Sequence, residues 1–319
     1  MKAAILDTLG APPRYGDFAE PEALPGETIV TVRAAAIKQL DRAIVAGRHY
    51  SSPKPEALPI VPGQDGIGVS ADGTRGYFLA NRRPFGAMAE RVPVRWLAPV
   101  PDAIDDATAA AIVNPALAAW LPLAWRAELQ PGETVLVLGA TGAAGGFAVQ
   151  AARLLGAGRV IAAGRNPAVL AALDADATID LTLAGDDLVA AFRALGQIDV
   201  VIDYVWGPPV EALLQALTNA HTDVAGGSDR GTRIVTLGEM AGSHASLPSG
   251  VFRSSRLKLL GSGTGNFPPG QRMRNMIADI FASTLRGDIA ISTDARPLMQ
   301  VSDAWNLAAV SDSRIVLLP

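Results

Sequence analysis

The stretch from Thr134 to Gly145 constrains the fold of this chain most, because an apolar run leads directly into glycines and then into an alanine-rich segment. A short, continuous run of Val and Leu is typical of a buried parallel strand. Gly142 permits a tight turn with no Cβ in the way of a ligand, and Gly145 permits close packing of the next helix on the strand. The free amides at that helix start are suited to a pyrophosphate. The predicted pyrophosphate contacts are Thr141, Gly142, Ala143 and Ala144.

The residues after this turn complete a βαβ unit of about thirty residues. A helical segment follows and stops at Gly156-Ala157-Gly158, and a second strand begins at Arg159. The spacing Ala140-x-Gly142-x-x-Gly145 departs from the strict dinucleotide fingerprint, because Ala stands where the first glycine is usual. An alanine-rich helix packed on a sheet without any ligand is the alternative. The strand, the glycines and the second strand together favour nucleotide binding.

The end of the second strand predicts which coenzyme binds. In NAD-preferring sites an acid at this point accepts hydrogen bonds from the ribose 2′-hydroxyl, whereas this chain has Gly164-Arg165-Asn166. A guanidinium holds a phosphate through two parallel hydrogen bonds, so the pattern predicts NADPH. The alternative is that Arg165 is a solvated loop charge before the next helix. Leu237 and Gly238, which follow the strand-like run at Ile234, complete the predicted cofactor contacts.

Composition excludes several classes of function. The 319 residues are 49% hydrophobic, which is ample for buried cores, and the net charge is −4 from 27 Lys and Arg against 31 Asp and Glu. Nucleic acids and anionic membranes are therefore not expected partners. There is no cysteine, which excludes disulfides and thiolate catalysis. The amino terminus is typical of a first strand rather than a signal peptide, so we expect a cytoplasmic protein.

The pattern of short runs changes along the chain. Up to residue 115, turn residues separate short strands in the manner of an antiparallel barrel or sandwich. From 116 to 263, strand-like runs alternate with helical segments as in a doubly wound parallel sheet. The apolar stretch from Ala109 to Trp125 is shorter than a membrane helix requires, and we expect a buried helix crossing between domains. A glycine-rich, polar segment from His221 to Gly231 predicts a mobile surface loop.

In these features the chain resembles the zinc-independent quinone oxidoreductases of the medium-chain dehydrogenase/reductase superfamily. The resemblance covers nearly the whole chain and depends on the order and spacing of many short motifs. These motifs are Asp41 with Gly47 and Tyr50, Pro62-Gly63-Gln64-Asp65-Gly66, Phe85-Gly86-Ala87-Met88-Ala89-Glu90, the turn from Gly139 to Gly145, Asp199-Val200-Val201-Ile202-Asp203, Gly231-Thr232-Arg233-Ile234-Val235 and Arg314-Ile315-Val316-Leu317.

The resemblance implies an α/β fold with two domains. A Rossmann doubly wound parallel sheet, residues 116–263, would bind NADP. An N-terminal GroES-like, mainly antiparallel β barrel domain, residues 1–115 and 264–319, would be catalytic. Proteins that this chain resembles are commonly dimers through the edge of the Rossmann sheet, so a homodimer is expected.

The departures from the alcohol dehydrogenase branch predict that no metal takes part. The cysteine and the histidine that hold the catalytic zinc there would fall at Lys38 and Gln64. The three histidines, His49, His221 and His244, have no ligand spacing. Oxidation of an alcohol by a zinc-dependent mechanism is therefore disfavoured.

Lys38 and Tyr50 are the candidate catalytic residues. The quinone reductase branch usually has Asn at the position of Lys38. The ammonium either polarises or protonates a substrate oxygen, or forms a plain ion pair with Asp41, and the ion pair is favoured. The Tyr50 hydroxyl either meets a substrate carbonyl, or its ring packs down to close the loop after Gly47-Arg48-His49.

The sequence therefore predicts an NADPH-dependent reductase that transfers a hydride to a quinone or to the β-carbon of an α,β-unsaturated carbonyl. Both acceptors gather negative charge on oxygen, which nearby donors would stabilise. The expected partner is a small carbonyl or quinone substrate. The alternative is a catalytically idle NADPH-binding protein that acts as a redox sensor or binding partner, because a fold does not establish turnover.

Overall fold

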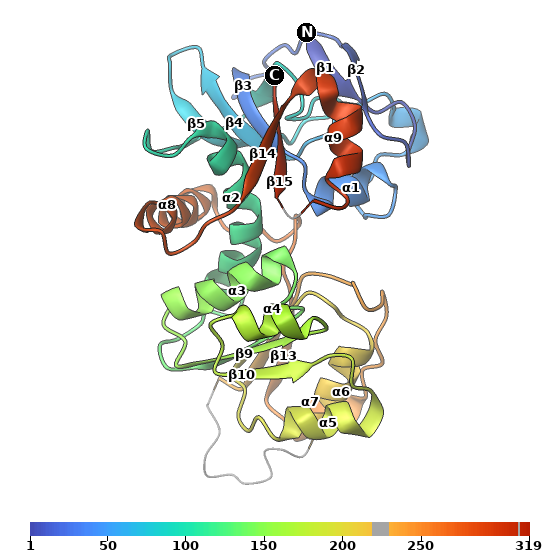
Figure 1. Cartoon of the computed structure of the whole chain (residues 1–319), viewed down its shortest axis with the longest axis vertical. Helices are drawn as coiled ribbons and strands as arrows, with labels where there is room; N and C mark the ends of the chain where they lie inside the picture. The colour runs from blue at the N-terminus through green and yellow to red at the C-terminus, as the bar shows by residue number, and fades with distance from the viewer. Residues whose placement is uncertain (219–229, 312) are drawn as a thin grey trace. The chain divides into compact units, whose positions relative to one another are not determined.

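The computed structural model describes residues 1–218, 230–311 and 313–319, and its chain forms two compact units (Figure 1). The first unit comprises Met1–Asn114 and Arg274–Pro319, and the second comprises Pro115–Met273. The sequence analysis places the corresponding boundaries after residues 115 and 263. The assignment of catalysis to one unit and of coenzyme binding to the other stays a prediction.

The second unit contains a six-stranded sheet in which every neighbouring pair is parallel, in the order β10-β9-β8-β11-β12-β13. Numbered from β8, this is the order 3-2-1-4-5-6 of a dinucleotide-binding fold. Val201, for example, lies between Leu136 and Ile234, and all three side chains are fully buried. The strands are β8 (Thr134–Leu138), β9 (Arg159–Gly164), β10 (Ala177–Asp180), β11 (Val200–Asp203), β12 (Thr232–Thr236) and β13 (Leu257–Gly261).

Helices cover both faces of this sheet, with α3 and α4 on one side and α5, α6 and α7 on the other (Figure 1). The predicted doubly wound architecture is therefore confirmed. Strand β10 was missed by the sequence analysis because only Ile179 of its four residues is buried, so no apolar run marks it. The helices are α3 (Ala143–Leu154), α4 (Pro167–Ala172), α5 (Gly185–Arg193), α6 (Pro208–Leu217) and α7 (Ser249–Ser254).

The apolar stretch before this sheet forms α2 (Asp106–Trp120), which continues as the π-helix η2 (Leu121–Arg126). The prediction of a buried helix is confirmed, but the length argument behind it is wrong, because the combined helix spans 21 residues. By length and composition it would be able to cross a membrane, yet 72% of its apolar window is buried inside the protein. A core helix passes the same test, so this helix is weak evidence for a membrane span. It contains the boundary between the units, which follows Asn114.

The first unit is built on a seven-stranded sheet in the order β14-β15-β3-β4-β5-β7, with β6 also pairing with β3. All its pairs are antiparallel except β14 with β15, as predicted for a mainly antiparallel domain. A separate antiparallel pair, β1 and β2, packs on the same core. The strands are β1 (Lys2–Ile5), β2 (Arg14–Asp17), β3 (Thr28–Ala36), β4 (Asp65–Ser70), β5 (Arg75–Leu79), β6 (Arg91–Val94), β7 (Ala98–Pro99), β14 (Thr293–Pro297) and β15 (Arg314–Leu318).

Helices complete the first unit, although the first residues of α8 (Gly270–Arg286) belong to the second unit. The carboxyl-terminal segment of the first unit returns through α8 and adds β14 and β15 to the sheet, so both ends of the chain contribute to one core. The helices are α1 (Gln39–Val45), η1 (Pro55–Ala57), α8 (Gly270–Arg286), η3 (Leu298–Gln300) and α9 (Val301–Leu307).

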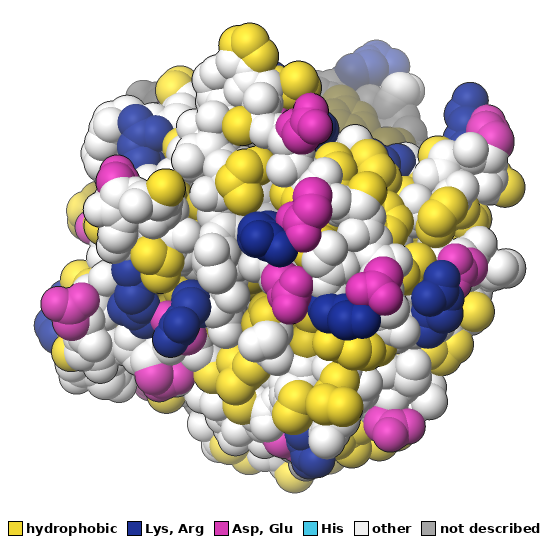
Figure 2. All heavy atoms as spheres, turned by 90° about the horizontal axis from the view of Figure 1, so that it is seen from above, with side chains coloured by type: hydrophobic (Ala, Val, Ile, Leu, Met, Phe, Trp, Pro, Cys, Tyr) yellow, Lys and Arg dark blue, Asp and Glu magenta, His cyan; other side chains and the backbone are white. Residues whose placement is uncertain are grey.

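Charged side chains are interspersed on the face of the molecule that Figure 2 shows, with basic and acidic groups side by side. Exposed ion pairs of the first unit, such as Lys2 with Asp17 and Arg91 with Glu20, follow the same pattern. This face therefore has no extended area of one sign. The predicted mobile loop from His221 to Gly231 lies, apart from Arg230 and Gly231, outside the described residues.

Candidate functional site

The glycine turn after β8 has the geometry of a phosphate-binding helix start. Gly139 has a φ of 90°, a conformation that L side chains rarely adopt. Its amide and that of Ala140 donate to the carbonyl of Ala163 on β9, at 2.9 and 2.8 Å, which holds the turn against the sheet. Gly142 is the N-cap of α3, and no side chain caps the helix. The first amides of α3 therefore have no side-chain cap, and their contact with a pyrophosphate stays a prediction.

Gly145 brings α3 onto the end of the strand. A Cβ at this position would lie 2.2 Å from the carbonyl oxygen of Gly139, whereas a Cβ at Gly146 would meet nothing closer than 3.9 Å. Gly142 and Ala143 are exposed, and Thr141 and Ala144 are half-buried. The turn therefore offers an accessible backbone cradle on a rigid base, which fits a dinucleotide pyrophosphate.

The residues predicted at the ribose position lie beside this turn. A Cβ at Gly164 would lie 2.4 Å from Cγ2 of Thr141, so the ends of β8 and β9 meet closely there. Arg165 is exposed and, among the described residues, has no ion-pair partner. Oδ1 of Asn166 accepts from the amides of Ala168 and Val169 at 3.1 and 3.2 Å, so Asn166 caps α4. Arg165 is thus the cation of this group that is available to a phosphate.

Leu237 and Gly238 follow β12 and pack against the turn that follows β11. The amide of Leu237 donates to the carbonyl of Asp203 at 2.8 Å. A Cβ at Gly238 would lie 2.5 Å from the carbonyl oxygen of Tyr204. Both residues are half-buried, at the carboxyl ends of the strands, where ligands of such sheets bind.

Lys38 lies in a buried group of polar residues in the first unit, at the junction of β3 and α1. Its ammonium donates to Asp65, at the start of β4, and lies 3.4 Å from Oδ2 of Asp41. The hydroxyl of Tyr77 donates to the other oxygen of Asp65 at 2.7 Å. Arg314 completes the group through its charge. We call these five residues, Lys38, Asp41, Asp65, Tyr77 and Arg314, the Lys38 cluster.

The favoured ion pair between Lys38 and Asp41 is present, and both of its side chains are buried. The lysine is 1% exposed, and Asp65 is a second carboxylate partner that sequence spacing did not reveal. Asp41 also caps α1, because its Oδ2 accepts from the Lys38 amide at 3.0 Å, and its Oδ1 accepts from the Gln64 amide at 3.1 Å. The ammonium therefore links the start of α1 to the start of β4.

Burial and the charges of neighbouring members together set the pKa values in the Lys38 cluster. Burial disfavours the charged ammonium, but Asp41 and Asp65 outweigh it, so the pKa of Lys38 is raised. Burial raises the pKa of Asp41 above its usual value although Lys38 opposes the shift. Burial also raises the pKa of Tyr77 and keeps its phenol neutral. At neutral pH the cluster thus contains a charged ammonium.

Tyr50 lies in the loop after α1 and is 75% exposed. Its ring stacks on that of His49, with centroids 4.0 Å apart and planes 34° apart. Nδ1 of His49 accepts from the Ser51 amide at 3.1 Å, which fixes the imidazole within the loop. The structure therefore leaves most of the Tyr50 ring accessible and does not bring Tyr50 together with the buried Lys38.

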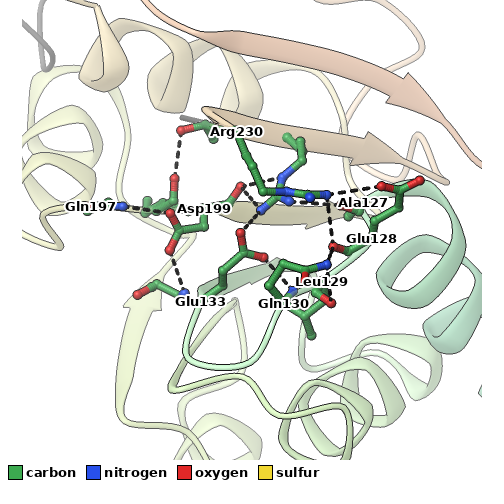
Figure 3. Close-up of polar contacts among 12 residues, drawn as sticks. Ala127, Glu128, Leu129, Gln130, Glu133, Gln197, Asp199 and Arg230 are labelled. Carbon is green, nitrogen blue, oxygen red and sulfur yellow. Dashed lines mark hydrogen bonds and ion pairs between the residues drawn. The ribbon is translucent and has the colours of Figure 1, made fainter. Parts of the chain in front are cut away.

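A second buried charge cluster lies at the amino-terminal edge of the parallel sheet, far along the strands from the glycine turn (Figure 3). Arg233, 3% exposed, pairs with Glu133 at 2.6 Å and donates to the carbonyl of Ala127 at 3.1 Å. Oδ2 of Asp199 accepts from the amide of Thr134 at 2.9 Å. Ligands of such sheets bind at the opposite edge, so we assign these contacts to stability of the unit.

Among the described residues, no group of three or more His, Asp or Glu side chains is arranged to hold a metal ion. Two residues stand where the resemblance would place zinc ligands. Lys38 is engaged by carboxylates, and Gln64 donates its backbone amide to Asp41. A buried ammonium thus supplies positive charge at this point of the fold.

Comparisons with known proteins agree with the two-unit fold described above. No family model matches the chain. A probable NADPH-dependent quinone reductase from Emericella nidulans is 27% identical over 368 residues, which cover 100% of both chains. The quinone oxidoreductase from Thermus thermophilus, solved also in complex with NADPH, is 28% identical, with a TM-score of 0.77 over 100% of both chains.

The chain is similar to quinone oxidoreductases in sequence and in fold. A further relative, an NADPH-dependent alkenal/one oxidoreductase from Arabidopsis thaliana, is 29% identical over 233 residues, 62% of this chain and 58% of the relative. The likeness to a solved quinone oxidoreductase confirms the predicted fold class, with a Rossmann sheet and a mainly antiparallel domain.

Sequence reasoning missed three members of the Lys38 cluster, namely Asp65, Tyr77 and Arg314. Asp65 stands in the motif Pro62-Gly63-Gln64-Asp65-Gly66, whose aspartate received no function in the sequence analysis. An acid at the start of a buried strand is the signal that would have found it, because such a charge requires a partner. Nothing in the local sequence marks Tyr77, which lies between Gly76 and Phe78 in the buried middle of β5.

Proposed function

We propose that this protein is an NADPH-dependent oxidoreductase that transfers a hydride to a quinone or an α,β-unsaturated carbonyl, without zinc. The observation that carries the proposal is the exposed, uncapped turn at Gly142 and Ala143, with the exposed Arg165 guanidinium at the ribose position. The names of the relatives, quinone reductase and alkenal/one oxidoreductase, support the same acceptor classes.

The residues for the coenzyme divide into three groups. The amides from Thr141 to Ala144 would hold the pyrophosphate, as helix starts do. Gly164 and Asn166 would line the ribose, and the Arg165 guanidinium would hold the 2′-phosphate. Leu237 and Gly238 would line the nicotinamide half. When bound, NADPH supplies the hydride, and the chain binds and orients it.

The acceptor gains a hydride and a proton, and its oxygen gathers negative charge before the proton arrives. The Tyr50 hydroxyl is the proposed donor to that oxygen, because its side chain is accessible. Lys38 contacts carboxylates instead, so we propose that it acts as a positioning residue for α1 and β4. Water is the proposed source of the proton.

The decisive experiment follows NADPH oxidation by absorbance with a panel of quinones and enones, and repeats it with NADH. Turnover that prefers NADPH supports the proposal. Tight NADPH binding by calorimetry, with no oxidation by any acceptor, would instead support the idle redox sensor. Parallel metal analysis of the purified protein is the control, because stoichiometric zinc lost together with activity would contradict a zinc-independent reaction.

We further propose that the protein is cytoplasmic and forms a homodimer. The absence of cysteine suits a reducing compartment, and the superfamily resemblance supports pairing of two chains. Light scattering coupled to size exclusion measures the mass directly. A mass of one chain at working concentration would contradict the dimer.

A further inference from the structure

Trp206 has a strained backbone at the carboxyl edge of the parallel sheet. Its φ is 55°, and among the described residues only one other non-glycine residue, Glu128, has a positive φ. This region places Cβ too close to the neighbouring carbonyl, so a bulky side chain is rarely found there. Glycine would adopt the same conformation without this cost. An observed outlier of this kind is a reason to look for a function.

The turn around Trp206 is fixed by several contacts. Oδ1 of Asp203, a fully buried carboxyl, accepts from the amides of Val205 and Trp206, both at 2.9 Å. The carbonyl of Val205 accepts from the amide of Ala241 at 2.7 Å. A Cβ at Gly207 would lie 3.1 Å from the carbonyl oxygen of Ala241, so the two segments touch by backbone. The surroundings therefore impose the strained conformation on whichever residue stands at 206.

The position of this turn relates it to the coenzyme. β8 and β11 are neighbours whose connections leave in opposite directions, through α3 toward β9 and through α6 toward β12. Ligands of doubly wound sheets bind at such a switch point, outside the carboxyl ends. Arg165 follows β9, so the adenosine half belongs on that side. The nicotinamide half then belongs beside β11 and β12, where Trp206 lies.

The indole is half-buried, with part of its surface packed on the core of the unit. Packing fixes the ring, and the accessible part remains for a ligand. A rigid indole stacks well on a flat, conjugated ring, and gains little from a short acyclic chain.

We propose that Trp206 is a stacking platform for a planar acceptor ring, which selects quinones over acyclic enones. The inference rests on the proposed function and names the acceptor class within it. It also explains why a strained tryptophan stands where glycine would fit.

The test compares Trp206→Gly and Trp206→Phe with the wild type. We measure kcat/KM for menadione and for trans-2-hexenal, and NADPH affinity by calorimetry. Trp206→Gly should lower the ratio of menadione to hexenal by about tenfold, because the stacking partner is lost. Trp206→Phe should keep this ratio within about threefold, since a smaller aromatic ring still stacks. NADPH affinity should change little in either variant.

Glu128→Gly is the matched control, because it removes the other positive-φ side chain at the opposite edge of the sheet. It should leave the acceptor ratio unchanged. Equal losses of kcat/KM for both acceptors in Trp206→Gly would overturn the proposal that Trp206 is a stacking platform. A large loss of NADPH affinity with an unchanged ratio of menadione to hexenal would overturn it as well.

A binding measurement separates this inference from the proposed function. Menadione is titrated into the NADP⁺-loaded protein and tryptophan fluorescence is followed. Trp206→Gly should weaken menadione binding, and Trp206→Leu replaces it if the glycine variant fails to fold. Unchanged menadione affinity would refute the platform. A wild type that binds menadione through Trp206 yet oxidises no NADPH would refute only the proposed function.

Discussion

Replacing Lys38 by methionine tests the buried ammonium directly. The change keeps the apolar stem but removes a charge that is 1% exposed and engages two carboxylates. Asp41 and Asp65 would then lie in the interior with Arg314 as the remaining cation of the Lys38 cluster. Removing one partner of a buried pair costs about 3–5 kcal/mol. A unit of this size loses about 2–4 °C for each kcal/mol, so the melting temperature should fall by about 6–20 °C.

The loss should depend on pH in a defined direction. Without the ammonium the pKa of Asp41 rises further, because the attraction that opposes its desolvation is gone. A carboxyl whose pKa is higher in the folded state binds its proton more readily when folded. Its stabilising effect is therefore present below the unfolded pKa and is lost as pH rises through the folded pKa. The variant should accordingly be closer to the wild type in mildly acidic buffer than in mildly alkaline buffer.

Circular dichroism melts in both buffers are the assay, with Lys2→Met as the matched control. Lys2 pairs with Asp17 at 2.8 Å, but both side chains are exposed, so its loss should hardly change the melt. The double variant Lys38→Met with Asp65→Asn should recover part of the loss, because one unpaired carboxylate is removed. If the fall in melting temperature of Lys38→Met is independent of pH and no larger than that of Lys2→Met, the argument from a buried Lys38 cluster is refuted.

The rate of hydride transfer in a single turnover distinguishes a positioning role of Lys38 from direct contact of Lys38 with the substrate. If Lys38 acts through α1 and β4, the rate constant of the folded Lys38→Met variant should stay within a few-fold of the wild type. A loss of about 10²-fold, with NADPH affinity intact, would place the ammonium at the acceptor oxygen.

Four further outcomes are expected. Arg165→Ala should weaken NADPH more than NADH by about 1.5–3 kcal/mol in titration calorimetry, and equal losses would contradict a contact with the 2′-phosphate. Gly145→Ala should abolish coenzyme binding or folding, because its Cβ would lie 2.2 Å from the oxygen of Gly139, whereas Gly146→Ala should be tolerated in the same assays. Arg233→Met should lower stability by about 3–5 kcal/mol in urea unfolding without selectively weakening NADPH, and a coenzyme-specific effect would argue against a structural function. Exhaustive chelation should leave NADPH oxidation unchanged, and loss of activity restored by zinc would contradict this expectation.

Local sequence determined the features that we propose for the coenzyme half of the site. Gly145 is required by the close approach of α3 to Gly139, and the apolar runs at β8 and β11 are buried on both faces. Such features depend on residues that are close together in the sequence, so composition and spacing are enough to predict them. Arg165 was predictable for the same reason, since its place at the end of β9 follows from counting along the βαβ unit.

Tertiary structure decided the state of Lys38 and the place of Trp206. The spacing of Lys38 and Asp41 predicted a pair, but burial and the second carboxylate come from β4, which pairs with β3 only in the folded unit. The positive φ of Trp206 is imposed by Asp203 and by the segment after β12, which no local preference of tryptophan would produce. Sequence periodicity indicates which side chains are buried. Which charges meet in the interior, and which backbone is strained, depends on contacts between segments far apart in the chain.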